Sequence, residues 1–116
     1  MSNDSNDGRI DYIEFPAQDL KRTKTFYSKV FRWQFTDYGP DYTAFADGRL
    51  AGGYYRADST DAGALTVIYA VDLEGMQARI EHAGGTISEP IFAFPGGRRF
   101  HFRDPEGNEL AVWSDK

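Results

Sequence analysis

Two side chains of this sequence could move a proton near neutral pH, and both lie in stretches that alternate like β-strands. Glu14 belongs to the stretch Ile10–Phe15, and His101 belongs to Phe100–Arg103. A carboxylate and an imidazole that face the same way could shift a proton next to a carbonyl group, as a metal-free isomerase or lyase does. A lone histidine on a strand is more often a hydrogen-bonded structural residue. The acid–base hypothesis therefore stands beside a purely structural one.

The stretch that contains His101 is predicted to be the first strand of a β-hairpin that closes the chain. Phe100–Arg103 and Glu109–Trp113 alternate with a period of two, and Asp104–Asn108 supplies the Pro, Gly and Asn of a turn. One face of the hairpin is apolar, with Phe100, Phe102, Leu110 and Val112. The other face is too polar for a core and too aromatic for ordinary surface, which indicates a site; it carries Arg99, His101, Arg103, Glu109, Ala111 and Trp113.

The composition predicts one acidic domain in a reducing compartment. The chain has 116 residues, a net charge of −5 and no cysteine. The charge argues against nucleic acid as a partner, and no apolar run reaches the roughly 20 residues of a membrane span. The lack of cysteine excludes disulfides and thiolate catalysis and favours the cytoplasm. Residues 1–8 are polar and are predicted to be a disordered tail, and residues 9–116 are predicted to form a single domain.

The order of elements in the first half of the domain recurs in the second half. Asp19 and Asp72 are predicted N-caps of helices that reach about Phe31 and Gly84-Gly85, and Ala57–Gly63 is the predicted linker. Each half comprises a strand, a helix and three strands, which predicts an α+β fold of two βαβββ modules at about 9–57 and 64–116. The expected strands are Ile10–Phe15 (stopped by Pro16), Trp33–Tyr38, Tyr42–Ala46, Leu50–Arg56, Leu65–Val71, the fragments Thr86–Ser88 and Ile91–Phe94, and the closing hairpin.

Several short motifs within this repeat resemble those of the vicinal oxygen chelate superfamily, which includes glyoxalase I, bleomycin-resistance proteins and extradiol dioxygenases. The resemblance covers Ile10–Trp113 and is closest to small bacterial glyoxalase-related proteins. It implies one curved, eight-stranded mixed sheet with a helix behind each half, and a homodimer. Arg32 departs from the family, which usually has Gly there, and indicates an altered helix exit. The motifs are Asp19-Leu20, Phe26-Tyr27, Phe31-Arg32-Trp33 and Asp104-Pro105-Glu106-Gly107-Asn108.

In metal-dependent members of this family, four inward-facing strand positions supply His or Glu ligands. The resemblance places these positions at Tyr12, Gly52, Thr66 and Ala111, and none of them is a good metal ligand. We therefore expect no metal and no other cofactor. An alternative is a displaced metal site made of Glu14, His101 and Glu109. In a simpler interpretation, Glu14 forms an ion pair with Arg99 or Arg103, and Glu109 is exposed.

The inward face is instead predicted to form an aromatic cleft for a small organic molecule. In this interpretation Tyr54 and Trp113 are equivalent positions of the two halves, and Glu14 could hold a cation. One alternative is that these rings only pack against a dimer partner. Another is a glyoxalase-like lyase, isomerase or dioxygenase with an atypical metal or acid–base site, for which Glu14 and His101 are the catalytic candidates. The predicted ligand-binding residues are Tyr12, Glu14, Tyr42, Tyr54, Arg99, His101 and Trp113.

Overall fold

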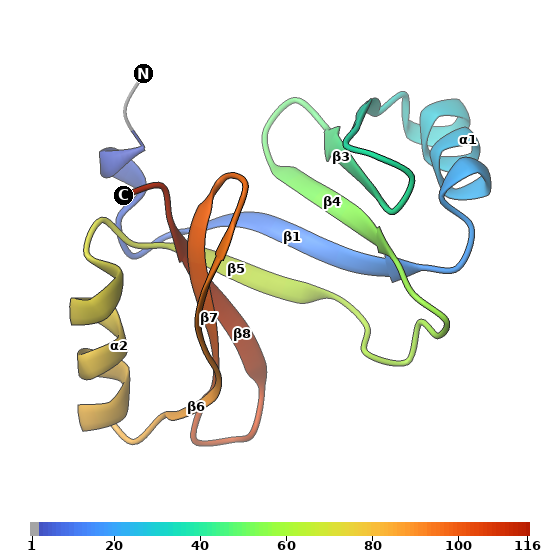
Figure 1. Ribbon diagram of the computed structural model, residues 1–116. Coiled ribbons are helices and arrows are strands. Elements are labelled where there is room, and N and C mark those ends of the chain that lie inside the picture. The colour runs from blue at the N-terminus through green and yellow to red at the C-terminus, as the bar shows by residue number, and fades with distance from the viewer. Residues whose placement is uncertain (1–2) are drawn as a thin grey trace. The chain divides into compact units, whose positions relative to one another are not determined.

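The computed structural model describes residues 3–116 and contains one mixed, open sheet of eight strands and two α-helices (Figure 1). Met1 and Ser2 lie outside the described residues, and so does that part of the predicted tail. The α+β prediction is confirmed. The elements are a 3-10 helix η1 (Asp4–Asn6), β1 (Ile10–Ala17), α1 (Leu20–Phe31), β2 (Gln34–Asp37), β3 (Tyr42–Ala46), β4 (Ala51–Arg56), β5 (Leu65–Tyr69), α2 (Leu73–His82), β6 (Thr86–Phe94), β7 (Gly97–Arg103) and β8 (Glu109–Ser114).

The strand order is β2-β3-β4-β1-β5-β8-β7-β6. The pairs β1–β4 and β5–β8 are parallel, whereas β2–β3, β3–β4, β6–β7 and β7–β8 are antiparallel. Each half of the chain therefore repeats the same pattern, in which its first strand pairs with its last strand in parallel and the intervening strands follow as antiparallel neighbours. This is the arrangement expected of two βαβββ modules.

The strand breaks predicted at Pro16 and around Pro90 are wrong. The first strand does not stop at Pro16 but runs on to Ala17, with Pro16 in register with Tyr55. The proline lies one residue from the end of the strand, where a missing N–H costs little. The two fragments predicted around Pro90 are one strand, β6, whose register with β7 shifts between Ile87 and Phe92. These irregularities accommodate the proline without ending the strand.

The described chain divides into two compact units. The N-terminal unit comprises residues 12–65, and the C-terminal unit comprises residues 3–11 together with 66–116. In the C-terminal unit, the segment before β1 is tied to β5 by hydrogen bonds from Gly8 N–H to Tyr69 O and from Tyr69 N–H to Arg9 O. Asp7 also accepts a hydrogen bond from the Val71 N–H, at 2.8 Å.

The core of the N-terminal unit is a stack of aromatic rings. Trp33 lies between Tyr27 of α1 and Phe45 of β3, at centroid distances of 4.9 and 4.5 Å. Phe15 stacks on Tyr54 at 5.2 Å on the same side of the sheet. Although α1 contributes Tyr27, none of its residues is fully buried. Ring stacking adds to the free energy gained from apolar burial, so this core depends on ring geometry as well as on buried area.

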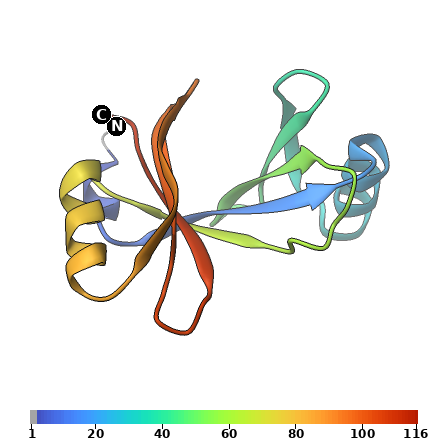
Figure 2. The same ribbon diagram turned by 60° about the horizontal axis from the view of Figure 1, so that its bottom comes forward.

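The C-terminal unit has a mainly aliphatic core with two phenylalanines. Phe100, Val112 and Leu73 are almost completely buried, and Met76 and Ile80 of α2 pack against them. Figure 2 shows α2 alongside the strands of its own unit, which agrees with the contacts of α2 with β6, β7 and β8. The apolar face predicted for the closing hairpin is therefore the face that α2 covers.

Both helices begin as predicted, but they end differently. Asp19 and Asp72 accept hydrogen bonds from the N–H groups of Arg22 and Gly75, each at 3.0 Å, which confirms both N-caps. Gly84 follows α2 with a φ of +101°, whereas Arg32 follows α1 with a φ of +62°. The altered exit predicted at Arg32 is thus a left-handed backbone held by a residue with a side chain, which costs roughly 1–2 kcal/mol.

Candidate functional site

The face of the N-terminal unit opposite α1 carries a cluster of hydroxyl and carboxyl groups. Along β1, Ile13 and Phe15 point into the ring stack, so Tyr12 and Glu14 lie on the other face of the strand. The third member of the cluster, Tyr42, is on β3. Glu14 is a polar residue that is only 6% exposed. A buried carboxylate requires hydrogen-bond donors, and this cluster supplies one.

The three side chains form one hydrogen-bonded chain. The Tyr42 hydroxyl donates to Glu14 Oε2 at 2.9 Å, and the hydroxyls of Tyr12 and Tyr42 are hydrogen-bonded to each other. Burial, and secondarily the negative charge of Glu14, raises the pKa of Tyr42 well above the ordinary tyrosine value. Tyr42 therefore stays protonated and acts as a hydrogen-bond relay, not as a second anion.

Gly53 of β4 makes room for this cluster. It is in register with Glu14 on β1 and with Ala44 on β3. A Cβ atom at Gly53 would collide with the hydroxyls of both tyrosines. The family resemblance places the corresponding position at Gly52, not at Gly53, but a Cβ at Gly52 would meet the Phe45 ring in the core. The sequence signal for this close approach is the pair of adjacent glycines in one predicted strand, because each glycine lacks a side chain on a different face of the sheet.

Tyr54 does not belong to the cluster, so its predicted face is wrong. It is 4% exposed and lies in the ring stack beneath α1. Its neighbour Tyr55 is in register with Pro16, and Trp113 is in register with Tyr69. Pro16 and Tyr69 stand at the same distance before the two helix N-caps, so Tyr55, not Tyr54, is the counterpart of Trp113. A shift of one residue in a strand moves a side chain to the opposite face.

The Tyr54 side chain is nevertheless close to a shallow surface pocket of the N-terminal unit. This pocket has a volume of about 270 Å³ and lies where β1 leads into α1. Pro16, Gln18, Arg22 and Thr60 also line it. Tyr54 could thus meet a ligand only from the α1 side of the sheet, and not together with Tyr12 or Tyr42.

The C-terminal unit holds His101 next to a carboxylate on the face opposite α2. Glu109 Oε2 is 3.3 Å from His101 Nδ1 and accepts a hydrogen bond of 3.1 Å from the Ser88 hydroxyl. The other ring nitrogen, Nε2, is buried and has no hydrogen-bond partner within the described chain. A carboxylate on one ring nitrogen favours the tautomer with its proton there and leaves the second nitrogen as an acceptor. Glu109 thus orients His101.

Arg99 and Trp113 lie in register on the same face of the β7–β8 hairpin. The Arg99 guanidinium lies over the rings of Phe92 and Phe94, at 5.3 and 6.0 Å from their centroids. The Trp113 indole N–H donates to Asp11 Oδ1 at 3.0 Å. Burial raises the pKa of Asp11, and the hydrogen bond from Trp113 opposes this shift only in part. Arg99, His101 and Trp113 are thus placed on one face of their unit, as the hairpin pattern predicts.

The residues at the family's metal positions do not fit a metal ion. Tyr12 offers a neutral phenol, and the β4 position on its face is Gly53. On β8, Ala111 is in register with Val67, so Thr66 lies on the opposite face. Divalent metals require several imidazole, carboxylate or thiolate donors, and this set has none. Among residues 3–116 no three His, Asp or Glu side chains are close enough together to hold an ion.

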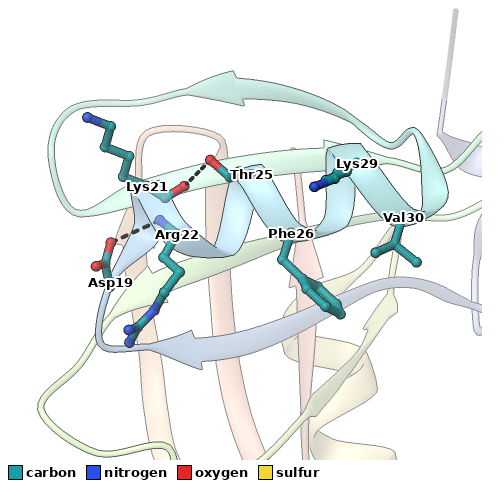
Figure 3. A pocket seen from close by; sticks show the side chains of 7 residues that line it. All are labelled: Asp19, Lys21, Arg22, Thr25, Phe26, Lys29 and Val30. Atoms are coloured by element: carbon teal, nitrogen blue, oxygen red, sulfur yellow. Dashed lines mark hydrogen bonds between the residues drawn. The ribbon is translucent and has the colours of Figure 1, made fainter.

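A second surface feature of the N-terminal unit is the outer side of α1 (Figure 3). An open pocket of about 520 Å³ lies along this helix. Phe26 and Val30 project from the same side of the helix and are 54% and 53% exposed, with cationic side chains around them. The pocket is lined by Asp19, Lys21, Arg22, Thr25, Phe26, Lys29 and Val30. Its cationic side chains surround two apolar ones, so it is an apolar and cationic surface.

Comparison with known proteins identifies the family of this chain. Residues 9–112 match the family described as the Glyoxalase/Bleomycin resistance protein/Dioxygenase superfamily. The chain belongs to this superfamily, as its motifs indicate. A search of curated protein sequences found no significant match. Within the described residues no helix is long and apolar enough to cross a bilayer.

Solved structures share the fold at low sequence identity. A superfamily member from Vibrio splendidus 12B01 has a TM-score of 0.73 and 13% identity, with 92% of this chain and 98% of that chain covered. Methylmalonyl-CoA epimerase from Mycobacterium tuberculosis has a TM-score of 0.68 and 12% identity, with 98% and 91% covered. The Mn(II)-bound glyoxalase from Novosphingobium aromaticivorans has a TM-score of 0.67 and 22% identity, with 91% of this chain but 38% of that chain covered. At these identities the likeness shows the fold alone.

Proposed function

We propose that this protein binds a small organic molecule on the sheet face opposite α1, without a metal ion at the family's usual positions. The observation that carries this proposal is the half-buried chain of hydrogen bonds from Tyr12 through Tyr42 to Glu14. The cluster lies where the resemblance implies the first metal ligand. Because Gly53 has no side chain, the hydroxyls of Tyr12 and Tyr42 can occupy the space above it.

The chemistry of this face is suited to recognition. Two phenol rings provide apolar, planar surface, and their hydroxyls and Glu14 provide oriented polar atoms. Small-molecule sites typically combine such aromatic lining with a few convergent polar groups. For the C-terminal unit by itself we propose that Arg99, His101 and Trp113 form a binding surface, because they lie on one face with Phe92 and Phe94. Tyr54 is assigned to the packing of the ring stack.

A thermal-shift screen of metal-free protein tests the proposal. The panel comprises divalent metals, thiol conjugates, small 2-oxo compounds and planar organic cations. We expect at least one organic class to raise the melting temperature without metal, and Tyr42→Phe to remove that shift because it breaks the hydrogen-bond chain. Tyr38→Phe is the matched control, since Tyr38 is 66% exposed and lies outside the cluster.

Two results would contradict the proposal. One is stoichiometric Ni, Zn, Fe or Mn in protein purified without chelator. The other is the absence of any shift with all organic classes.

A second candidate function is acid–base catalysis by His101, in a lyase or isomerase of the glyoxalase-like range. The pairing of His101 Nδ1 with Glu109 favours it, because the buried Nε2 is then an acceptor. The sequence pattern pairs His101 with Glu14, but Glu109 is the carboxylate that His101 contacts within its own unit. If turnover is found with a compound from the screen, His101→Ala must abolish it. Undiminished turnover in His101→Ala would exclude this function.

The remaining expectations concern assembly and location. Membership of the superfamily is the reason to propose a homodimer, and static light scattering at high micromolar concentration tests it. A location in the cytoplasm and the single-domain boundaries at residues 9–116 likewise stay predictions.

A further inference from the structure

The outer side of α1 is a cationic surface on an acidic chain. The helix has no acidic residue and four cationic ones, Lys21, Arg22, Lys24 and Lys29, whereas the whole chain has a net charge of −5. Lys24 forms an ion pair with Asp37 at 2.9 Å. Within the described chain the other three cations of the helix form no ion pair, and all three are exposed. This side of α1 therefore carries positive charge that the described chain leaves unpaired.

The side chains on this surface form two neighbouring rows with a spacing of four residues (Figure 3). The rows are Lys21, Thr25 and Lys29, and Arg22, Phe26 and Val30. The Thr25 hydroxyl donates to the Lys21 carbonyl at 3.0 Å, so its hydrogen bond is made within the helix. Because Thr25 is short and stands between two long lysines, it leaves room beside Phe26 in the open pocket of about 520 Å³.

One acidic residue, Asp19, is among the seven that line this pocket. It is the N-cap of α1, and its Oδ1 accepts a hydrogen bond from the Arg22 N–H at 3.0 Å. Asp19 thus lies at the N-terminal end of the pocket and is engaged by the helix backbone. The two lysines on either side of Thr25 remain available to anionic groups of another molecule.

The spacing of Lys21, Thr25 and Lys29 matches that of a second helix. Residues four apart form ridges on a helix, and the ridges of one helix pack into the grooves of another. With a rise of about 1.5 Å per residue, four residues span about 6 Å along either helix. A partner helix with acidic residues four positions before and four positions after an apolar residue can therefore place the apolar side chain over Thr25 and a carboxylate near each lysine.

We propose that the outer side of α1 binds an acidic amphipathic helix of another protein, with an acidic residue, an apolar residue and an acidic residue at intervals of four positions. Charge complementarity with the unpaired cations supports this partner, and Phe26 and Val30, which are 54% and 53% exposed, supply the apolar part of the contact. This surface is distinct from the proposed small-molecule site, which lies on the sheet face opposite α1.

Two other occupants fit the surface less well. In a two-fold contact between two copies of this chain, the α1 surface would meet itself and place cations against cations. An anionic bilayer would satisfy the cations, but a helix that lies in a membrane surface presents a continuous apolar face. Here only Phe26 and Val30 are apolar among the residues that line the pocket.

Two fluorescein-labelled, alanine-based helical peptides of equal length test the chemistry of the partner. One has the central pattern Glu-x-x-x-Leu-x-x-x-Glu, and the other has Lys in place of each Glu. Fluorescence anisotropy with the full chain gives the dissociation constant of each peptide. We expect the Glu peptide to bind about tenfold more tightly than the Lys peptide at low ionic strength. This preference should shrink as added salt screens the charges.

A charge exchange gives the sharper test. The double variant Lys21→Glu/Lys29→Glu should weaken binding of the Glu peptide about tenfold and bind the Lys peptide instead, a reversal that loss of structure would not produce. Arg49→Glu reverses a charge in an exposed turn of the same unit, outside the pocket, and should leave both dissociation constants unchanged. Thermal melting of each variant verifies that it is folded.

A second pair of variants tests the space over Thr25. Thr25→Tyr should weaken binding of the Glu peptide about tenfold, because the ring occupies the position of the apolar side chain of the partner. Thr25→Ala is the matched control, since it keeps this space open and should leave binding unchanged.

Several results would overturn the inference. One is the absence of Glu-peptide binding at millimolar concentration, and another is equal binding of the two peptides. Binding that Lys21→Glu/Lys29→Glu does not alter would also overturn it. If this double variant abolishes self-association in static light scattering, a second copy covers the surface. If it abolishes attachment to phosphatidylglycerol vesicles, a membrane does, and either finding would contradict the proposed partner.

Discussion

The two halves of the chain share one order of elements but place different chemistry on the face away from their helices. The N-terminal unit has the hydroxyl–carboxylate chain of Tyr12, Tyr42 and Glu14. The C-terminal unit has the imidazole of His101 oriented by Glu109, beside a guanidinium and aromatic rings. The repeated backbone therefore sets equivalent positions, and the side chains at those positions decide what each half can do.

The helix-covered faces differ as well. The N-terminal unit stacks rings beneath α1 and leaves Phe26 and Val30 of that helix exposed. The C-terminal unit buries Leu73 of α2 against Phe100 and Val112. A helix that buries its leucine needs no further cover on that side, whereas α1 keeps apolar surface in contact with solvent. The N-terminal unit thus packs its sheet against its helix mainly through aromatic rings, and the C-terminal unit does so mainly through aliphatic side chains.

The largest expected effect tests the two cores directly. Phe45→Ala in the N-terminal unit and Phe100→Ala in the C-terminal unit should each lower the free energy of unfolding by about 3–5 kcal/mol. Both rings are buried, and Phe45 also stacks on Trp33 at 4.5 Å. Urea unfolding measures the effect, with the exposed Tyr38→Ala as control. A cost below about 1 kcal/mol at Phe45 would show that the ring stack does not stabilise its unit.

The two helix ends offer a comparison of about 1 kcal/mol in opposite directions. Arg32→Gly should stabilise the protein by about 0.5–1 kcal/mol, because a glycine adopts the φ of +62° without steric strain. Gly84→Ala should destabilise it by about 1–2 kcal/mol, since Gly84 has a φ of +101°.

Thermal melting checks both variants of the helix ends. Arg32→Ala serves as a control that removes the arginine side chain but keeps the Cβ, and it should not stabilise the protein. Stabilisation by Arg32→Ala equal to that of Arg32→Gly would mean that backbone strain at this position is negligible.

The smallest expected effect concerns the turns that close the last hairpin of each half. Asp47 accepts hydrogen bonds from the N–H groups of Arg49 and Leu50 at 2.8 and 2.7 Å, and Asp104 accepts from those of Glu106 and Asn108 at 2.9 Å. Backbone N–H groups hold the pKa of Asp47 below its ordinary value, and the Asn108 side chain, helped by backbone N–H groups, does the same for the pKa of Asp104.

A depressed folded-state pKa fixes the sign of the pH dependence. Each turn stabilises the fold fully above the ordinary carboxyl pKa of 3.8, and this contribution is lost as the pH falls through the lower folded-state value. Asp47→Ala and Asp104→Ala should therefore lower the melting temperature at pH 7 by a few degrees and by less at pH 3. Asp61→Ala, in an exposed loop, is the control. An unchanged difference between pH 7 and pH 3 would refute this interpretation.

Much of the fold could be predicted because its signals are local. The N-caps Asp19 and Asp72 and the alternation of the closing hairpin depend on residues close in sequence, and they are as predicted. The sequence does not predict which residues of β4 face the core, because Gly52 and Gly53 have no side chains whose alternation would assign the two faces. The error at Tyr54 follows from that gap, because one residue of register separates a core ring from a half-buried ring on the other face.

The amino-acid sequence by itself determined the repeated βαβββ order, the superfamily and the poor metal-binding character of the family's ligand positions, because these depend on residue types and short spacings. Only the tertiary structure decided which side chains meet. Tyr42 reaches Glu14 because β3 and β1 both pair with β4, and His101 meets Glu109 because β7 and β8 are in register. Such contacts join residues distant in sequence through sheet register, which no local pattern encodes.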